Sequence, residues 1–125
     1  MRMVIALIVG MVAAATPLFP LLAQEDRQVN QYEQLGVLVA DQCPADFRNA
    51  RLEGELDTGW ADLRLTCSAS NGESIEARLH GVAMYQIHRT LDAIREEMAA
   101  RSGNRWKTFV FNLTAARRFS FDVQY

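Results

Sequence analysis

The chain has 125 residues, of which 50% are hydrophobic, and its formal net charge is -2. This length suits one domain with one core rather than two, and an acidic balance excludes nucleic-acid binding driven by bulk positive charge and attachment to a membrane through a polybasic surface. Two cysteines are too few for a disulfide-dense miniprotein or a four-thiolate zinc site.

The first 23 residues differ in composition from the rest of the chain. Eighteen of them are hydrophobic, against 44 of the following 102. Arg2 precedes an apolar stretch from Val4 to Ala15, and Ala23 stands just before a polar segment. This order is typical of a secretory signal peptide, and we expect cleavage after Ala23. The folded domain would then span residues 24–125.

Two alternatives for this segment stay open. Cleavage could follow one of the alanines at 13–15 instead. The segment could also remain as a membrane anchor, because residues 3–23 are uncharged and barely long enough to span a bilayer. Pro17 and Pro20 argue against a continuous spanning helix. The first two interpretations make the protein periplasmic or secreted, and the anchor would hold it at the inner membrane facing the periplasm.

A helix is predicted over residues 26–42, where apolar residues recur at intervals of three and four. The residues that form this stripe are Val29, Tyr32, Leu35, Gly36 and Val39. Pro44 ends the helix, because proline disfavours the helical conformation of the residue before it.

Three strands are predicted next, over residues 48–57, 61–67 and 75–79, because polar and apolar residues alternate in each of them. Thr58–Gly59 and Asn71–Gly72 supply the turns between them.

A second helix is predicted over residues 82–101, which carry the clearest apolar stripe in the chain, and Gly103 follows its end. Two aromatic strands follow, over residues 106–113 and 119–125, with a loop at 114–117. Five strands with one apolar face each and two amphipathic helices predict an α+β fold of the order αβββαββ. We expect a two-layer sandwich in which both helices cover one face of an antiparallel sheet of about five strands and the other face meets water.

The two cysteines, Cys43 and Cys67, are predicted to form a disulfide, because an exported protein folds in an oxidising compartment. Closing a loop of this length stabilises a fold by roughly 3 kcal/mol in the chain-entropy description.

The two C-terminal strands carry a resemblance to a known family. Residues 106–113, led by Trp106, and residues 118–125, in which an aromatic pair leads to a terminal tyrosine, are similar to the closing strands of the YezG-like immunity protein family. Pro44 and Phe47 resemble a proline and an aromatic residue at the same place in that family. The sequence departs from the family in two ways. It has Ala115–Ala116–Arg117 in place of a turn that usually contains glycine, and it carries a predicted export signal although members of the family are typically cytosolic. The resemblance implies a protein that binds and neutralises a bacterial toxin, here within the periplasm.

Catalytic residues are scarce. His80 and His88 are eight positions apart across the start of a predicted helix, which is not the four-residue spacing that places two metal ligands on one helical face. Glu53 and Glu55 lie on one face of a strand and are interpreted as part of a solvated surface. We therefore expect no enzymatic activity, no metal and no cofactor.

Alternation predicts which side chains line the open face of the sheet. The expected partner-binding residues are Trp60, Asp62, Arg64, Glu53, Glu55 and Trp106. Tryptophan and arginine are enriched among the residues that dominate protein interfaces. The alternative is that Trp60 caps the sheet at its turn and that Trp106 packs beneath the loop after the second helix.

These observations predict an exported binding protein, most concretely an immunity protein that occludes a toxin. A structural accessory of an envelope complex is the main alternative, and a small hydrolase is the third. We expect a protein partner, a monomer or a weak dimer, no nucleic acid, and membrane contact only through an uncleaved N-terminus.

Overall fold

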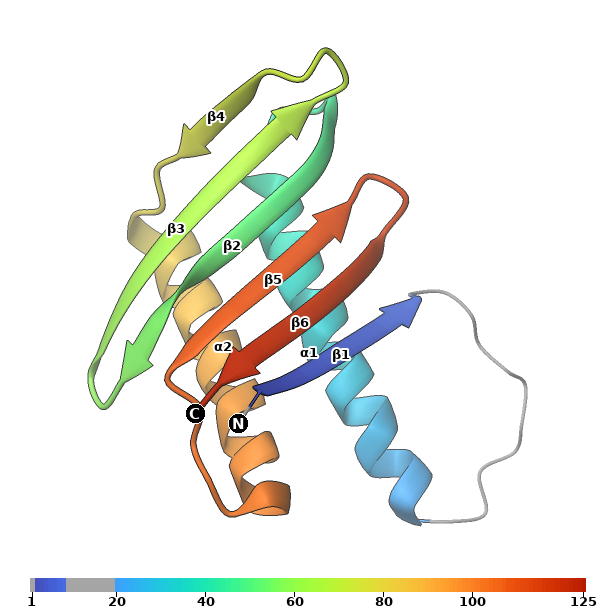
Figure 1. Ribbon diagram of the computed structural model, residues 1–125, viewed down its shortest axis with the longest axis vertical. Helices are drawn as coiled ribbons and strands as arrows, with labels where there is room; N and C mark the ends of the chain where they lie inside the picture. The colour runs from blue at the N-terminus through green and yellow to red at the C-terminus, as the bar shows by residue number, and fades with distance from the viewer. Residues whose placement is uncertain (1, 9–19) are drawn as a thin grey trace.

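The computed structural model describes residues 2–8 and 20–125, with side chains from Asn30 onwards. Its centre is an antiparallel sheet with the strand order β1-β6-β5-β2-β3-β4 (Figure 1). The strands are β1 (Arg2–Ile8), β2 (Phe47–Asp57), β3 (Trp60–Ala69), β4 (Ser74–Ala77), β5 (Thr108–Thr114) and β6 (Arg118–Gln124). The helices α1 (Pro20–Asp41) and α2 (Gly81–Ser102) lie side by side on one face of the sheet (Figure 1).

The predicted α+β sandwich is confirmed, including the order of helix, three strands, helix and two strands between α1 and β6. The first helix is longer than predicted, because it begins at Pro20 rather than at residue 26. Proline suits the first turn of a helix, since its fixed φ is helical and no hydrogen bond is lost there. Neither helix that the structure describes is long and apolar enough to cross a membrane.

Strand β1 lies within the segment that the sequence predicts to be a signal peptide. It pairs with β6 along its whole length, from Arg2 opposite Gln124 to Ile8 opposite Arg118. The predicted cleavage point after Ala23 falls in the first turns of α1. Cleavage there would remove β1 and leave β6 at the edge of a five-stranded sheet.

The core lies between the helices and the sheet. Tyr32 of α1 stacks on Phe119, with ring centroids 5.2 Å apart, and packs against Phe121 at 5.4 Å. Its hydroxyl donates a weak hydrogen bond to Met98 Sδ of α2, and burial raises the pKa of this phenol. Strands β2 and β3 contribute the fully buried Leu52 and Leu65. Burying these side chains supplies the main driving force for folding.

The predicted disulfide between Cys43 and Cys67 is confirmed, with Cα atoms 5.8 Å apart. It joins the chain just after α1 to β3, at the opposite end of α1 from the segment that leads to β1. The helix layer and the sheet are therefore tied covalently at one end of the sandwich.

The β2–β3 turn and the β5–β6 turn each contain a residue with a positive φ, but only one of these residues is glycine. Gly59 in the β2–β3 turn has φ = 81°, which glycine adopts without strain. In the β5–β6 turn it is Arg117 that has a positive φ, of 65°. A non-glycine residue here occupies a backbone region that favours glycine.

Candidate functional site

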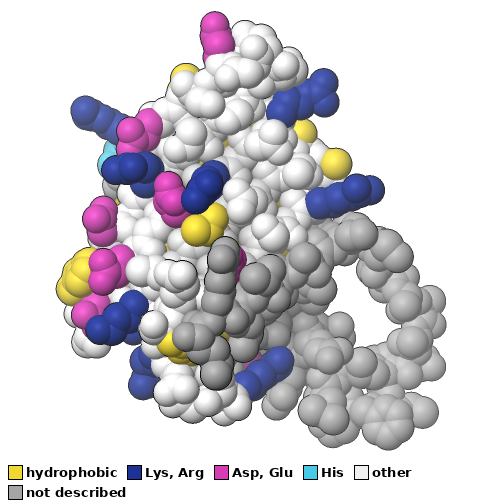
Figure 2. Space-filling view, in the orientation of Figure 1, with side chains coloured by type: hydrophobic (Ala, Val, Ile, Leu, Met, Phe, Trp, Pro, Cys, Tyr) yellow, Lys and Arg dark blue, Asp and Glu magenta, His cyan; other side chains and the backbone are white. Residues whose placement is uncertain are grey.

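The face of the sheet opposite the helices is polar. Because strand residues alternate between faces, each strand that buries apolar residues against the helices presents polar ones on the other side. Register places Asp62, Glu55, Thr108 and Gln124 in one row across four strands, and Arg64, Glu53, Val110 and Asp122 in the next. Figure 2 looks onto this face and shows acidic side chains gathered over the β2–β3 part of the sheet, with basic side chains among them.

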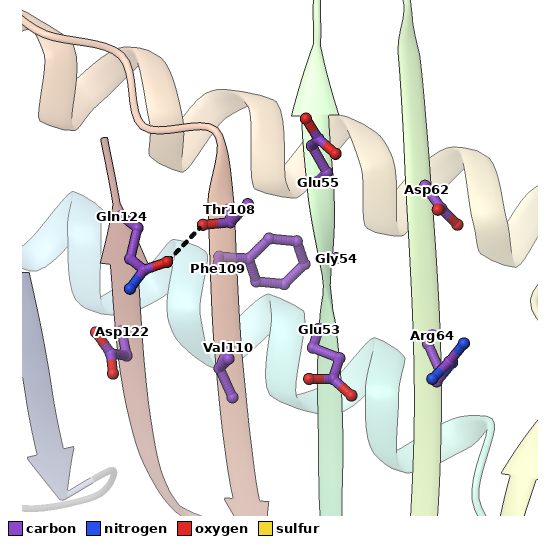
Figure 3. A pocket seen from close by; sticks show the side chains of 10 residues that line it. All are labelled: Glu53, Gly54, Glu55, Asp62, Arg64, Thr108, Phe109, Val110, Asp122 and Gln124. Carbon is purple, nitrogen blue, oxygen red and sulfur yellow. Dashed lines mark hydrogen bonds between the residues drawn. The ribbon is translucent and has the colours of Figure 1, made fainter. Parts of the chain in front are cut away.

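These two rows border a groove of about 450 Å³ (Figure 3). Its lining residues are Glu53, Gly54, Glu55, Asp62, Arg64, Thr108, Phe109, Val110, Asp122 and Gln124. Thr108 Oγ1 donates a hydrogen bond to Gln124 Oε1 at 3.3 Å across the strands β5 and β6. The groove is therefore an open depression of the sheet surface, lined by polar side chains together with Phe109 and Val110.

The groove carries a negative charge. Among the described residues that line it, four are carboxylates and one, Arg64, is cationic. Arg64 Nε also lies 3.3 Å from Glu76 Oε1, so its charge is shared with a carboxylate outside the groove. Glu53 has a cation of its own, since Arg51 donates to its Oε2 at 3.1 Å. Both pairs are solvent-exposed, so they hold the fold together only weakly.

Glu55 and Asp62 lie directly opposite each other on β2 and β3. In the part of the chain that the structure describes, neither carboxylate has a hydrogen bond or an ion pair. Like charges at directly opposed positions destabilise a sheet. This end of the groove therefore holds two exposed carboxylates on directly opposed residues, a setting that a cationic group from another molecule would stabilise.

Trp60 begins β3, next to this carboxylate pair. It lies opposite Asp57, and 47% of its surface is exposed. A large aromatic side chain with this exposure at a hairpin end is available for contact with a partner. The predicted exposure of Trp60 is confirmed. Trp60 is not one of the residues that line the groove.

The prediction that Trp106 faces outward is wrong, because its side chain is completely buried. Strand β5 begins only at Thr108, so the alternation that assigned Trp106 to the open face does not extend to it. The indole instead packs against Phe109 and Phe121, with ring centroids 5.6 Å away in both cases. Arg95 Nε donates to the Trp106 carbonyl oxygen at 2.7 Å and fixes the loop from α2 to β5. The alternative placement of Trp106, beneath this loop, is the one that the structure has.

The histidines lie away from the groove. His80 immediately precedes α2 and is exposed, whereas His88 is half-buried within α2. Among the residues that the structure describes, no three His, Cys, Asp or Glu side chains are grouped so that they could hold a metal ion. The groove lining offers carboxylates, a guanidinium, an amide and one hydroxyl, which are groups that can recognise a ligand through charge and hydrogen bonds.

Asp122 and Gln124 are two groove residues that the sequence prediction missed. They belong to β6, whose apolar residues Phe119, Phe121 and Val123 all face the helices. The same alternation places 122 and 124 on the open face. These residues reach the groove because β5 lies beside β2 in the sheet. Alternation within a strand does not predict which strands are neighbours.

No family model matches the chain, and no curated protein matches its sequence.

Proposed function

We propose that this protein is an exported binding protein that recognises a basic surface of a partner protein through its acidic groove. The observation that carries the proposal is the opposed pair of Glu55 and Asp62, which has no neutralising cation among the described residues and lies beside the exposed Trp60. Arginine or lysine of a partner would meet both the carboxylates and an aromatic face there. Complementary charge of this kind speeds encounter and selects among partners.

Export is the second part of the proposal. A hydrophobic N-terminal segment after Arg2 is typical of a secretory leader, and the Cys43–Cys67 disulfide suits an oxidising compartment such as the periplasm. We infer that the partner is met in or beyond the periplasm.

The resemblance of residues 106–125 to YezG-like immunity proteins leads us to propose a bacterial toxin as the partner. Occlusion of the toxin's basic surface would then be the whole mechanism, with no reaction of its own. A toxin that acts on nucleic acid would present such a surface, because it must bind phosphates.

The proposal can be tested by capture from the source organism, using the tagged chain and mass spectrometry of the bound proteins. The wild type should retain one stoichiometric partner. The double variant Glu55→Lys, Asp62→Lys should lose it, whereas Asp46→Lys, which changes an exposed carboxylate outside the groove, should keep it. A partner with a toxin domain would support the immunity function, and an envelope component would support an accessory role. Equal capture by all three chains would contradict binding through the groove.

A further inference from the structure

We propose that the outer edge of β6 is an acceptor site for one extended strand of a partner protein, and that β1 occupies this site until it is removed. In the structure β1 pairs antiparallel with β6 over seven residues, from Arg118 to Gln124 (Figure 1). The β6 edge becomes available only when the leader is removed, as proposed above. The proposal does not depend on the acidic groove.

The backbone groups of β6 that pair with β1 lie on this edge. Lys107 N–H donates to the Gln124 carbonyl oxygen at 3.0 Å, and Arg118 N–H donates to Thr114 Oγ1 at 3.2 Å. Residues 118 and 124 therefore direct their backbone groups toward β5. Because these directions alternate along a strand, Phe119, Phe121 and Val123 direct theirs toward β1. Without β1, the N–H and C=O groups of these three residues would form an unpaired edge.

The position of α1 limits what can pair there. Tyr32 of α1 stacks on Phe119 and Phe121, so α1 lies directly against β6. A second copy joined symmetrically through β6 would place its own β6 about 4.8 Å away. The turn of its α1 that carries Tyr32 would then crowd the same turn of the first copy, because packed helices need about 8–10 Å between axes. A lone strand, such as β1, brings no helix with it and meets no such obstacle.

The sequence of β1 indicates the kind of segment that fits. The positions opposite Val123, Phe121 and Phe119 are Met3, Ile5 and Leu7, all of them apolar. The inferred occupant is an extended segment of the partner that runs antiparallel to β6 and has apolar residues at three alternating positions. Strand addition of this kind takes its affinity from backbone hydrogen bonds and its specificity from alternate side chains.

Proline substitutions in the full chain test the edge. Ile5 is opposite Phe121, so its N–H faces β6, whereas the N–H of Ala6 faces away. Ile5→Pro removes a ladder donor, and Ala6→Pro serves as the matched control. Hydrogen exchange measured by NMR should become roughly fivefold faster or more at Phe119, Phe121 and Val123 in the Ile5→Pro chain, the factor expected for one net hydrogen bond. The amides of Ser120, Asp122 and Gln124, which face β5, are the internal reference and should not change.

A synthetic peptide with the sequence Arg2–Ile8 followed by two lysines is the probe for the acceptor site. Added to the Ile5→Pro chain at millimolar concentration, it should restore slow exchange at Phe119, Phe121 and Val123 alone. A peptide of the same length that carries serine at the positions of Met3, Ile5 and Leu7 should not. Unchanged exchange with the first peptide, equal effects of both peptides, or dimerisation of the Ile5→Pro chain would overturn the proposal. None of these readouts involves Glu55 or Asp62, so failure of the edge and failure of the groove are separable.

Discussion

Trp60 and Trp106 differ in burial far more than their sequence contexts suggest. Trp60 exposes 47% of its surface, while Trp106 is fully buried against two phenylalanines. The sequence contexts are alike, since each tryptophan stands near the start of a predicted strand. Whether such a residue belongs to the alternating strand or to the loop before it depends on packing around the preceding helix, and here Arg95 fixes that loop. The sequence therefore left both placements open.

Alanine substitutions should separate a binding role from a core role. Trp106→Ala should lower the free energy of unfolding by roughly 3–5 kcal/mol, because it leaves a cavity among aromatic rings. Trp60→Ala should change it by about 0.5 kcal/mol or less, as is usual at the surface, while weakening partner binding. Chemical denaturation monitored by circular dichroism measures both values. Similar losses of stability in the two variants would place Trp60 in the core and remove it from the binding surface.

Among the elements, β2 and α1 each contain a glycine at a contact with another element, and the two glycines have opposite roles. A Cβ on Gly54 of β2 would lie 1.9 Å from the backbone oxygen of Asp62 on β3. A Cβ on Gly36 of α1 would lie 3.6 Å from Leu113 Cδ1, which is an ordinary contact. Gly54 thus permits close approach of the two strands that carry the acidic pair, and Gly36 has no such requirement.

Substitution of these glycines by alanine gives a matched test of the strand packing. Gly54→Ala should destabilise the fold by about 1–3 kcal/mol, because backbone atoms must move to admit the methyl group. Gly36→Ala should stabilise it by up to about 1 kcal/mol, the gain of alanine over glycine within a helix. Thermal unfolding of both variants compares the two directly. A neutral or stabilising Gly54→Ala would show that β2 and β3 do not approach as closely as described.

Most elements could be predicted because their apolar residues have a clear period. Alternation defined β6, and three-to-four spacing defined α2. Strand β1 could not be predicted in this way, because residues 2–8 are an almost continuous apolar run that is equally typical of a secretory leader. Its pairing with β6 joins the two ends of the chain, a contact that no local pattern reveals.

At the scale of the whole molecule, the two faces of the sheet have different tasks. One face buries the core beneath α1 and α2 (Figure 1), and the other presents the acidic groove (Figure 3). The candidate site could be predicted in part, since Glu53, Glu55, Asp62 and Arg64 follow from alternation within β2 and β3. The contribution of β6 required the strand order of the sheet, which is set by contacts between distant parts of the chain.

The like charges of Glu55 and Asp62, at directly opposed positions, should weaken the fold and strengthen the proposed binding. Neutralising Asp62 should stabilise the free protein by roughly 0.2–1 kcal/mol, because it removes a pair of opposed like charges. The same change should weaken a complex with a basic partner. This combination is typical of residues kept for function rather than stability.

The most direct measurement is the dissociation constant of the captured partner for the wild type, Asp62→Asn and Asp46→Asn at low and high salt. Asp62→Asn should raise the constant by roughly tenfold at low salt, and high salt should reduce the difference, because the lost interaction is between charges. Asp46→Asn makes the same change in net charge outside the groove and should leave the constant within about twofold of the wild type. Equal effects of the two substitutions, or no effect of Asp62→Asn, would contradict recognition through the groove.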